Sequence, residues 1–135
     1  MAEKKFSLDI VTPTRTVFSG DVRSFSAPGE AGSFQILFNH APFLSSITVG
    51  QVRVVDPTGA ESRYATSGGF VEVNNNKVIL LAETAERSDE IDVQRAEKAK
   101  ERAAQRLREE ERIDEERARV ALARAINRLK IAEKH

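Results

Sequence analysis

The sequence predicts an α+β protein, with an N-terminal antiparallel β-sandwich in residues 1–86 and a C-terminal two-helix antiparallel hairpin in residues 87–135. Three observations lead to this fold class. The first part alternates apolar and polar side chains, which is the period of a half-buried strand. Every Gly, Pro and Phe lies within the first 71 residues. The second part has neither Gly nor Pro, and its apolar residues recur at helical spacing.

The strands are expected from alternation and from turn residues. Near the N-terminus Phe6, Leu8 and Ile10 share one face of an extended segment. An Asp-Pro-Thr-Gly turn at 56–59 joins two strand-like segments, and the asparagines at 74–76 separate FVEV from KVILLAE. Asn tolerates the left-handed backbone conformation that a tight hairpin requires. Short strands at such close intervals are typical of an antiparallel sandwich or barrel.

Two apolar stripes predict the two helices. The first runs through Ala96, Ala99, Ala103 and Leu107, with Ser88 and Asp89 as expected N-terminal caps. The second stripe is equally narrow and consists of Ala118, Leu122, Ala125, Leu129 and Ala132. Small residues let two helices approach closely, so an antiparallel hairpin is expected.

The joint between the helices leaves two arrangements open. EEERIDEE, residues 109–116, contains no helix breaker, so it suits either a fixed hairpin with an acidic turn or an extended, nearly continuous helix. Charge is also segregated, since residues 109–116 carry six acidic side chains, whereas residues 117–135 carry six basic side chains and one acidic one. This distribution either complements the helix dipole or provides a surface for an acidic partner.

Composition excludes several classes of protein. The chain has no Cys, so disulfides and thiolate zinc sites are absent, and its two histidines are too far apart to form a local metal site. No apolar run approaches the roughly 20 residues of a membrane span, and the N-terminus does not resemble a signal peptide. The net charge of zero argues against nucleic-acid binding. We therefore expect a soluble intracellular protein.

No catalytic motif is found. The GEAG segment at 29–32 lacks the Lys-Ser/Thr of a phosphate-binding loop, and there is no GxSxG elbow. His40 stands beside Ala41-Pro42 with no acid or nucleophile nearby in sequence, which favours a structural role over a small enzyme built on His40. The composition instead favours an interaction protein, for which one hypothesis is a stand-alone adaptor with a β-sandwich and a coiled coil.

Five segments in order resemble the ε subunit family of bacterial F-type ATP synthases, which corresponds to the δ subunit of mitochondria. They are PGEAGSFQILFNHAPFL, SGGFVEV, KVILLAETAER, IDVQRA and ALARAINRLKIAE. The resemblance covers essentially the whole chain. It implies a ten-stranded β-sandwich that packs on the γ subunit and the c-ring, and a non-catalytic rotor subunit that couples proton translocation to ATP synthesis.

The resemblance also implies a regulatory role and a location. Family helices fold into a hairpin or extend along γ into the α/β catalytic head, where the extended form inhibits ATP hydrolysis. The complex lies on the cytoplasmic face of the bacterial inner membrane, so this chain would meet the membrane only through the complex.

Several family members bind ATP on the closed hairpin through a motif that stands here as Ile91, Asp92, Arg95 and Ala96. The other family positions match Glu86, Arg102, Arg124 and Arg128. Arginine suits phosphate binding, and Arg124 and Arg128 share a helix face. ATP is thus an expected regulatory ligand and not a required cofactor. The alternative is ordinary helix-start electrostatics, with Asp92 near the positive end of the dipole and Arg95 one turn later.

The family's contact with γ and the c-ring maps to one loop region. The matching positions are Glu30, Gly32, Ser33, Phe34 and His40. Two departures affect it: a commonly acidic position is Ser33 here, and Phe38-Asn39 replaces the usual Pro-Gly. Because Asn tolerates the left-handed conformation, we expect Asn39 to preserve the turn.

Overall fold

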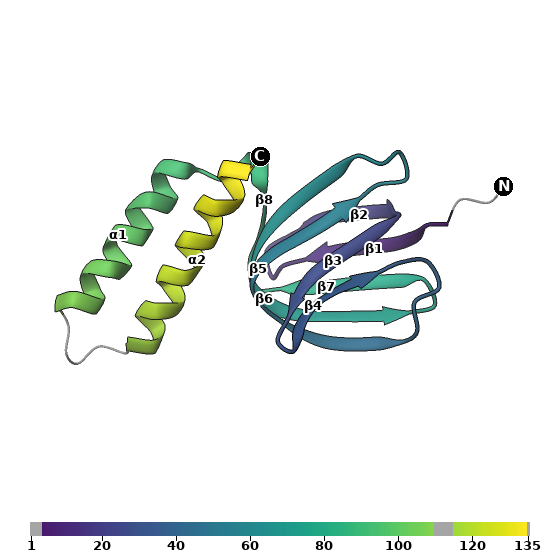
Figure 1. Ribbon diagram of the computed structural model, residues 1–135, viewed down its shortest axis with the longest axis horizontal. Helices are drawn as coiled ribbons and strands as arrows, with labels where there is room; N and C mark the ends of the chain where they lie inside the picture. The colour runs from purple at the N-terminus through teal and green to yellow at the C-terminus, as the bar shows by residue number, and fades with distance from the viewer. Residues whose placement is uncertain (1–3, 110–114, 135) are drawn as a thin grey trace.

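A computed structural model describes residues 4–109 and 115–134, in which eight strands precede a 3₁₀ turn and two helices (Figure 1). The strands are β1 (Phe6–Val11), β2 (Thr16–Val22), β3 (Ser24–Gly29), β4 (Gly32–Ile36), β5 (Phe43–Val55), β6 (Glu61–Asn74), β7 (Lys77–Ala82) and β8 (Ala85–Arg87). The 3₁₀ turn η1 is Ser88–Glu90, and the helices are α1 (Val93–Glu109) and α2 (Glu115–Lys134). The predicted fold class, a β-sandwich followed by two helices, is confirmed.

The strands follow the order β2-β1-β7-β6-β5-β3-β4, with β8 added beside β6. All pairs are antiparallel except β1–β7, which is parallel. The expectation of a purely antiparallel sandwich is wrong for this pair. β1 and β7 are joined through most of the domain, so no tight hairpin forces them to run in opposite directions.

The described residues form eight strands, two fewer than the ten that the resemblance implied. The difference lies in β5 and β6, of 13 and 14 residues, which pair along almost their whole length. Each continues past an irregularity at Thr48 and Gly68, which do not pair with each other. Beyond it β6 changes partner, from β8 to β7. Each of these long strands is therefore counted once, where two shorter strands would be counted if it were interrupted.

The core confirms the alternating pattern of the first strand. Phe6, Leu8 and Ile10 are all buried, and they join a single cluster drawn from all eight strands. Tyr64 is the largest side chain in this cluster, and its burial raises the pKa of its hydroxyl. Because this core lies wholly within residues 6–85, the sandwich has its own hydrophobic interior.

Three expected turns form with the predicted residues. Asn75 and Asn76 have φ of 49° and 58°, and Asn39 has φ of 62°, so each adopts the left-handed conformation. At the Asp-Pro-Thr-Gly turn the Asp56 carboxylate accepts hydrogen bonds from the backbone and hydroxyl of Thr58 and from the backbone of Ala60. The Thr58 hydroxyl is the main cause that lowers the pKa of Asp56.

The first helix begins later than the sequence suggested. Ser88 and Asp89 belong to η1, and the extended backbone of Ile91 separates this turn from α1. The residue whose side chain caps α1 is Asp92, which accepts a hydrogen bond from the backbone N–H of Arg95 at 3.0 Å. The prediction of Ser88 and Asp89 as caps is therefore wrong.

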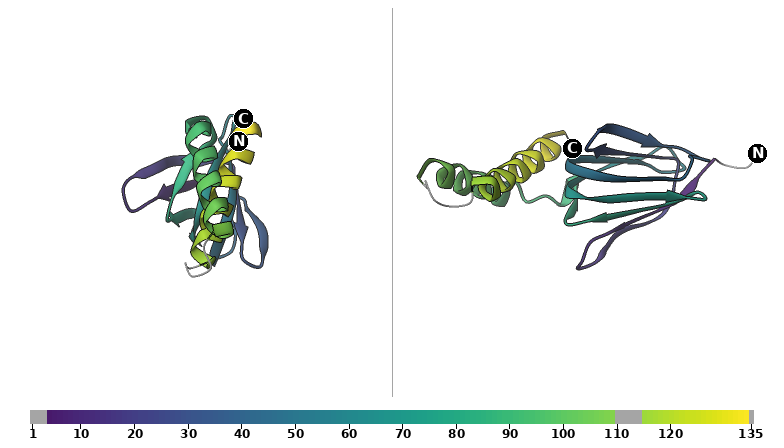
Figure 2. Two further views of the ribbon diagram at one scale, coloured as in Figure 1. Left: turned by 90° about the vertical axis from the view of Figure 1, so that its left-hand side faces the viewer. Right: turned by 90° about the horizontal axis from the view of Figure 1, so that it is seen from below.

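The two helices pack against each other as an antiparallel hairpin beside one end of the sandwich (Figures 1 and 2). Ala96 and Ala103 of α1 and Ala118 and Ala125 of α2 are buried, as their stripes predicted. The side chain of Leu107 and most of the expected acidic joint, residues 110–114, lie outside the described residues. Helix α2 packs against β5 and β6.

Candidate functional site

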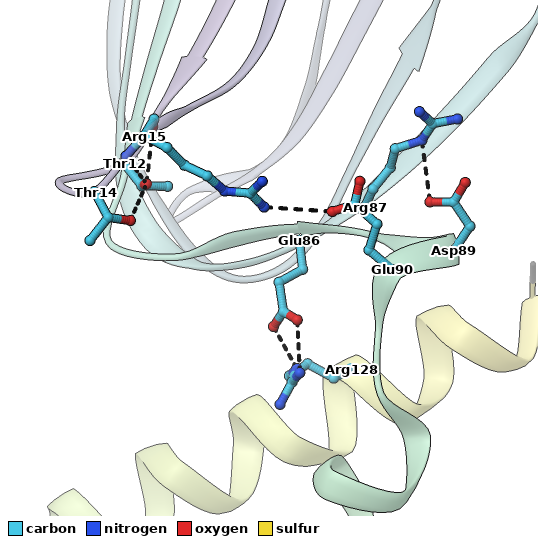
Figure 3. A network of polar contacts seen from close by, with 8 residues as sticks. All are labelled: Thr12, Thr14, Arg15, Glu86, Arg87, Asp89, Glu90 and Arg128. Atoms are coloured by element: carbon cyan, nitrogen blue, oxygen red, sulfur yellow. Dashed lines mark hydrogen bonds and ion pairs between the residues drawn. The ribbon is translucent and has the colours of Figure 1, made fainter.

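The site considered first is the contact between α2 and the sandwich. Glu86 extends from β8 toward α2, where Nη2 of Arg128 donates to its Oε2 at 2.8 Å and Nε lies 2.7 Å from Oε1 (Figure 3). The two side chains are 21% and 32% exposed for Arg128 and Glu86 respectively. Because both side chains are partly shielded from water, this ion pair is stronger than a fully exposed one.

Two more polar contacts of α2 flank this pair. Arg124, one helical turn before Arg128, donates to the carboxylate of Glu83 at 2.9 Å. Between them, the side-chain amide of Asn127 donates to the backbone carbonyl of Gly50 in β5 at 2.9 Å. The three contacts reach three different strands or strand ends, so together they define the orientation of α2.

A small apolar cluster completes the contact. Ile131 of α2 and Ile91, just before α1, are buried against Ala65 of β6, with Ala132 partly buried beside them. Ile131 is 2% exposed. This cluster is separate from the main core, so the hairpin adds little to the hydrophobic interior of the sandwich.

The structure brings some of the predicted nucleotide-binding residues into contact and leaves the others apart or exposed. Glu86 and Arg128 are in contact, and Ile91 lies in the small apolar cluster with Ile131, which is on α2 like Arg128. Ala96 is completely buried in the hairpin interface, which explains a need for a small residue there. Asp92 and Arg95 lie at the exposed start of α1, where Asp92 caps the helix.

Arg102 lies further along α1. It is two helical turns beyond Arg95, about 10 Å along the axis, and its Nε donates to the carbonyl of Lys98 at 3.4 Å. There it lines a groove of about 680 Å³ between the helices, together with Arg106, Arg117 and four alanines.

The residues predicted to contact γ and the c-ring occupy two places. Phe34 and His40 each pack edge-to-face against Phe43, with ring centroids 4.9 and 5.6 Å from that of Phe43. Gly32, Ser33 and Glu30 instead lie around the β3–β4 turn, where all three are exposed. The His40 side chain contacts the Ala41 carbonyl at 2.7 Å.

Sequence reasoning missed an apolar surface on the outer face of the sandwich. Leu44, Phe70, Ile79 and Leu81 are 71%, 58%, 38% and 56% exposed. Strand register places them side by side on β5, β6 and β7, since Phe70 pairs with Leu81, and Glu72 pairs with both Leu44 and Ile79. We call these four residues the apolar face. KVILLA carried the signal, because its apolar side chains occupy both faces of the strand.

A groove of about 610 Å³ adjoins this face. Phe70 and Leu81 belong to both, and the other lining residues are Val11, Thr12, Pro13, Glu30, Ser46, Ile47, Ser67, Gly68, Gly69, Ala82 and Glu83. Gly69 has φ of 148°, and a Cβ there would lie 2.0 Å from the carbonyl oxygen of Leu81. Close approach of β6 to β7 at the groove floor therefore requires glycine.

Residues 4–109 and 115–134 present neither a metal site nor a membrane-spanning helix. No group of three or more His, Asp or Glu side chains in this part of the chain is arranged to hold a metal ion. Neither of the helices described here is long and apolar enough to cross a membrane.

Comparisons with known proteins agree with these features. The sequence-family model of the ATP synthase delta/epsilon chain β-sandwich domain matches residues 5–88. The family model of the delta/epsilon chain long α-helix domain matches residues 89–133. The ATP synthase epsilon chain of Syntrophomonas wolfei is 47% identical over 107 residues, which are 79% of this chain and 78% of the relative. That of Pelotomaculum thermopropionicum is 48% identical with 79% of both chains covered, and that of Desulforamulus reducens is 50% identical with 74% and 75% covered.

Solved structures share the fold. A chain of the mitochondrial ATP synthase of Euglena gracilis, in an assembly of OSCP, F1 and c-ring, aligns with a TM-score of 0.82 at 20% identity, covering all of this chain and 84% of that one. A chain of the central stalk and c-ring of the Tetrahymena thermophila enzyme aligns with a TM-score of 0.63 at 12% identity, covering 98% and 99%. Sequence and structure together show that the chain belongs to the ATP synthase delta/epsilon chain family.

Proposed function

We propose that this chain is a non-catalytic rotor subunit in the central stalk of an F-type ATP synthase, where its sandwich docks on the γ subunit and the c-ring. The observation that carries the proposal is the apolar face, because a soluble domain rarely leaves several large apolar side chains adjacent and exposed unless a partner covers them. Its relatives are epsilon chains, and its structural neighbours come from F1/c-ring and central-stalk assemblies.

The sandwich suits the transmission of torque. Its single core and continuous strand pairing make it a stiff body, while the apolar face leaves β5, β6 and β7 available for a partner. In this role the subunit couples proton translocation to ATP synthesis without performing chemistry. It belongs to a membrane-bound complex and faces the cytoplasm of the bacterial cell, and it reaches the membrane only through the complex.

The hairpin has a regulatory role in this proposal. A small cluster of apolar residues and three side-chain contacts hold α2 against the sandwich. Release of the hairpin therefore requires much less free energy than unfolding of the protein. Released helices extend toward the α/β catalytic head and inhibit ATP hydrolysis. The adaptor alternative is less well supported, since Ala96, Ala103, Ala118 and Ala125, which a coiled-coil partner would contact, are buried.

ATP is the ligand that we propose for the closed hairpin. Support comes from the position of Arg128 beside Glu86 and of Arg124 one turn away, close to the segment that carries the IDVQRA motif. Both arginines are engaged by carboxylates here, so phosphate would have to replace Glu83 and Glu86 as their partners. A ligand that bridges the two helices would stabilise the closed arrangement by its differential affinity.

Truncation tests whether the sandwich binds γ without the helices. The variant that ends at residue 87 should remain folded and bind the γ subunit, because the core and the apolar face both lie before this residue. Phe70→Ser in the full chain should weaken γ binding by about tenfold or more, since it removes a large apolar contact at an interface. Arg53→Gln, which alters only an exposed ion pair with Glu61, is the control. Loss of γ binding on truncation would contradict the proposal.

A further inference from the structure

We propose that the groove beside the apolar face receives a Lys or Arg side chain from the subunit that docks there, held by Glu30 and Glu83. This inference rests on the proposed function, in which the docking subunit is γ. The groove, of about 610 Å³, is continuous with the apolar face through Phe70 and Leu81. A segment of the docking subunit that covers the apolar face would therefore also cover the groove.

The charges of the groove specify the chemistry of its occupant. Among its lining residues, Glu30 and Glu83 alone are charged, and both are acidic. Glu30 is exposed and has no ion pair with any described residue, although its backbone N–H donates to the Ser46 carbonyl at 3.3 Å. An apolar groove edged by carboxylates complements an apolar segment that carries one basic side chain.

The backbone explains how a long side chain fits. Glu30 follows β3 and Glu83 follows β7, with β5 and β6 between them, so the two backbones are three strand spacings, or about 14 Å, apart. Gly68 and Gly69 lie on β6 between the two acids and have no side chains to fill the space. A guanidinium or ammonium group above these glycines would be within reach of flexible carboxylates on either side.

Glu83 also ties the groove to the hairpin. Its carboxylate is the acceptor for Nη2 of Arg124 on α2, at 2.9 Å, and the Glu83 side chain is 66% exposed. A basic side chain in the groove would compete with Arg124 for this carboxylate. Docking of the partner on the sandwich would then weaken one of the three polar contacts that hold the hairpin closed.

Binding of the full chain to the purified γ subunit at 50 mM and 300 mM NaCl tests the inference. We expect Glu30→Gln and Glu83→Gln each to raise the Kd by roughly fivefold to tenfold at low salt, and the double variant to show a weaker salt dependence. Glu97→Gln, which removes the same charge from the exposed side of α1, is the matched control. All three glutamates are exposed, so thermal unfolding should confirm that the variants fold.

A variant that lacks a basic side chain, and is expected to bind more tightly, separates this inference from a general effect of charge. Arg124→Gln frees Glu83 and should tighten γ binding a few-fold, whereas the control Lys98→Gln should not. A double Glu30/Glu83 variant that binds within twofold of wild type would overturn the inference. If Phe70→Ser also binds normally, the proposed docking face fails with it, whereas weakened binding of Phe70→Ser alone leaves the proposed function standing.

Discussion

The Glu86 carboxylate and the Arg128 guanidinium join the end of the sandwich to α2, with a hydrogen bond of 2.8 Å between residues 42 positions apart. Figure 3 shows the Glu86 side chain turned toward the helix, away from the separate Arg15–Glu90 and Arg87–Asp89 pairs. The pair is near the centre of the α2 contact, so it should influence how readily the hairpin leaves the sandwich.

A double-mutant cycle with Glu86→Gln and Arg128→Gln measures this influence. We expect a coupling free energy of about 1 kcal/mol favouring the docked hairpin, since the pair is only partly shielded from water. The chain has no cysteine, so spin labels at Thr48→Cys and Glu133→Cys report the distance between sandwich and α2. The control is Arg53→Gln, which breaks the 2.6 Å pair with Glu61 within the sandwich. Distance distributions unchanged in all variants would show that the pair does not hold the hairpin.

Calorimetric titration with ATP tests the nucleotide proposal. Wild type should bind saturably, and Arg95→Ala should bind more weakly because it removes a phosphate partner at the start of α1. Glu83→Gln should bind ATP a few-fold more tightly, since Arg124 no longer has to leave a carboxylate. No heat with millimolar ATP for any variant would leave Asp92 with the capping role that its hydrogen bond to Arg95 already explains.

Gly69→Ala should destabilise the sandwich by about 2 kcal/mol or more. The φ of 148° is unfavourable for an L side chain, and the new Cβ would meet the backbone oxygen of Leu81 at 2.0 Å. Gly20→Ala is the matched control, because its Cβ would lie 3.5 Å from the flexible ring of Phe18. Urea unfolding of the two variants compares their free energies, and equal stabilities would contradict the steric argument.

Acid should weaken the β5–β6 turn through Asp56. Hydrogen bonds to the ionised carboxylate, chiefly from the Thr58 hydroxyl, lower its pKa in the folded protein. Its contribution to stability is therefore complete above the ordinary pKa of 3.8 and disappears as pH falls through the lower folded value. Asp56→Asn keeps an acceptor without a titratable group, so its unfolding temperature should fall less steeply than that of wild type at acidic pH. Parallel profiles would refute this assignment.

Local patterns determined the elements of this protein. Alternation placed Phe6, Leu8 and Ile10 in the core, the asparagines at 74–76 and Asn39 supplied left-handed turns, and alanine spacing identified both helix interfaces. These features depend on a few neighbouring residues, so a single sequence contains them. The fold class and family follow from the same segments, because their order along the chain is specific.

Only the tertiary structure decided which distant residues meet. The parallel β1–β7 pair, the apolar face across three strands, and the pairing of Arg124 with Glu83 and of Arg128 with Glu86 all join residues far apart in the chain. The sequence indicated that the two arginines share a helix face, but not which carboxylates lie opposite them. Such contacts depend on strand order and on where the hairpin rests. The packing of whole elements sets both, and no short stretch of sequence encodes either.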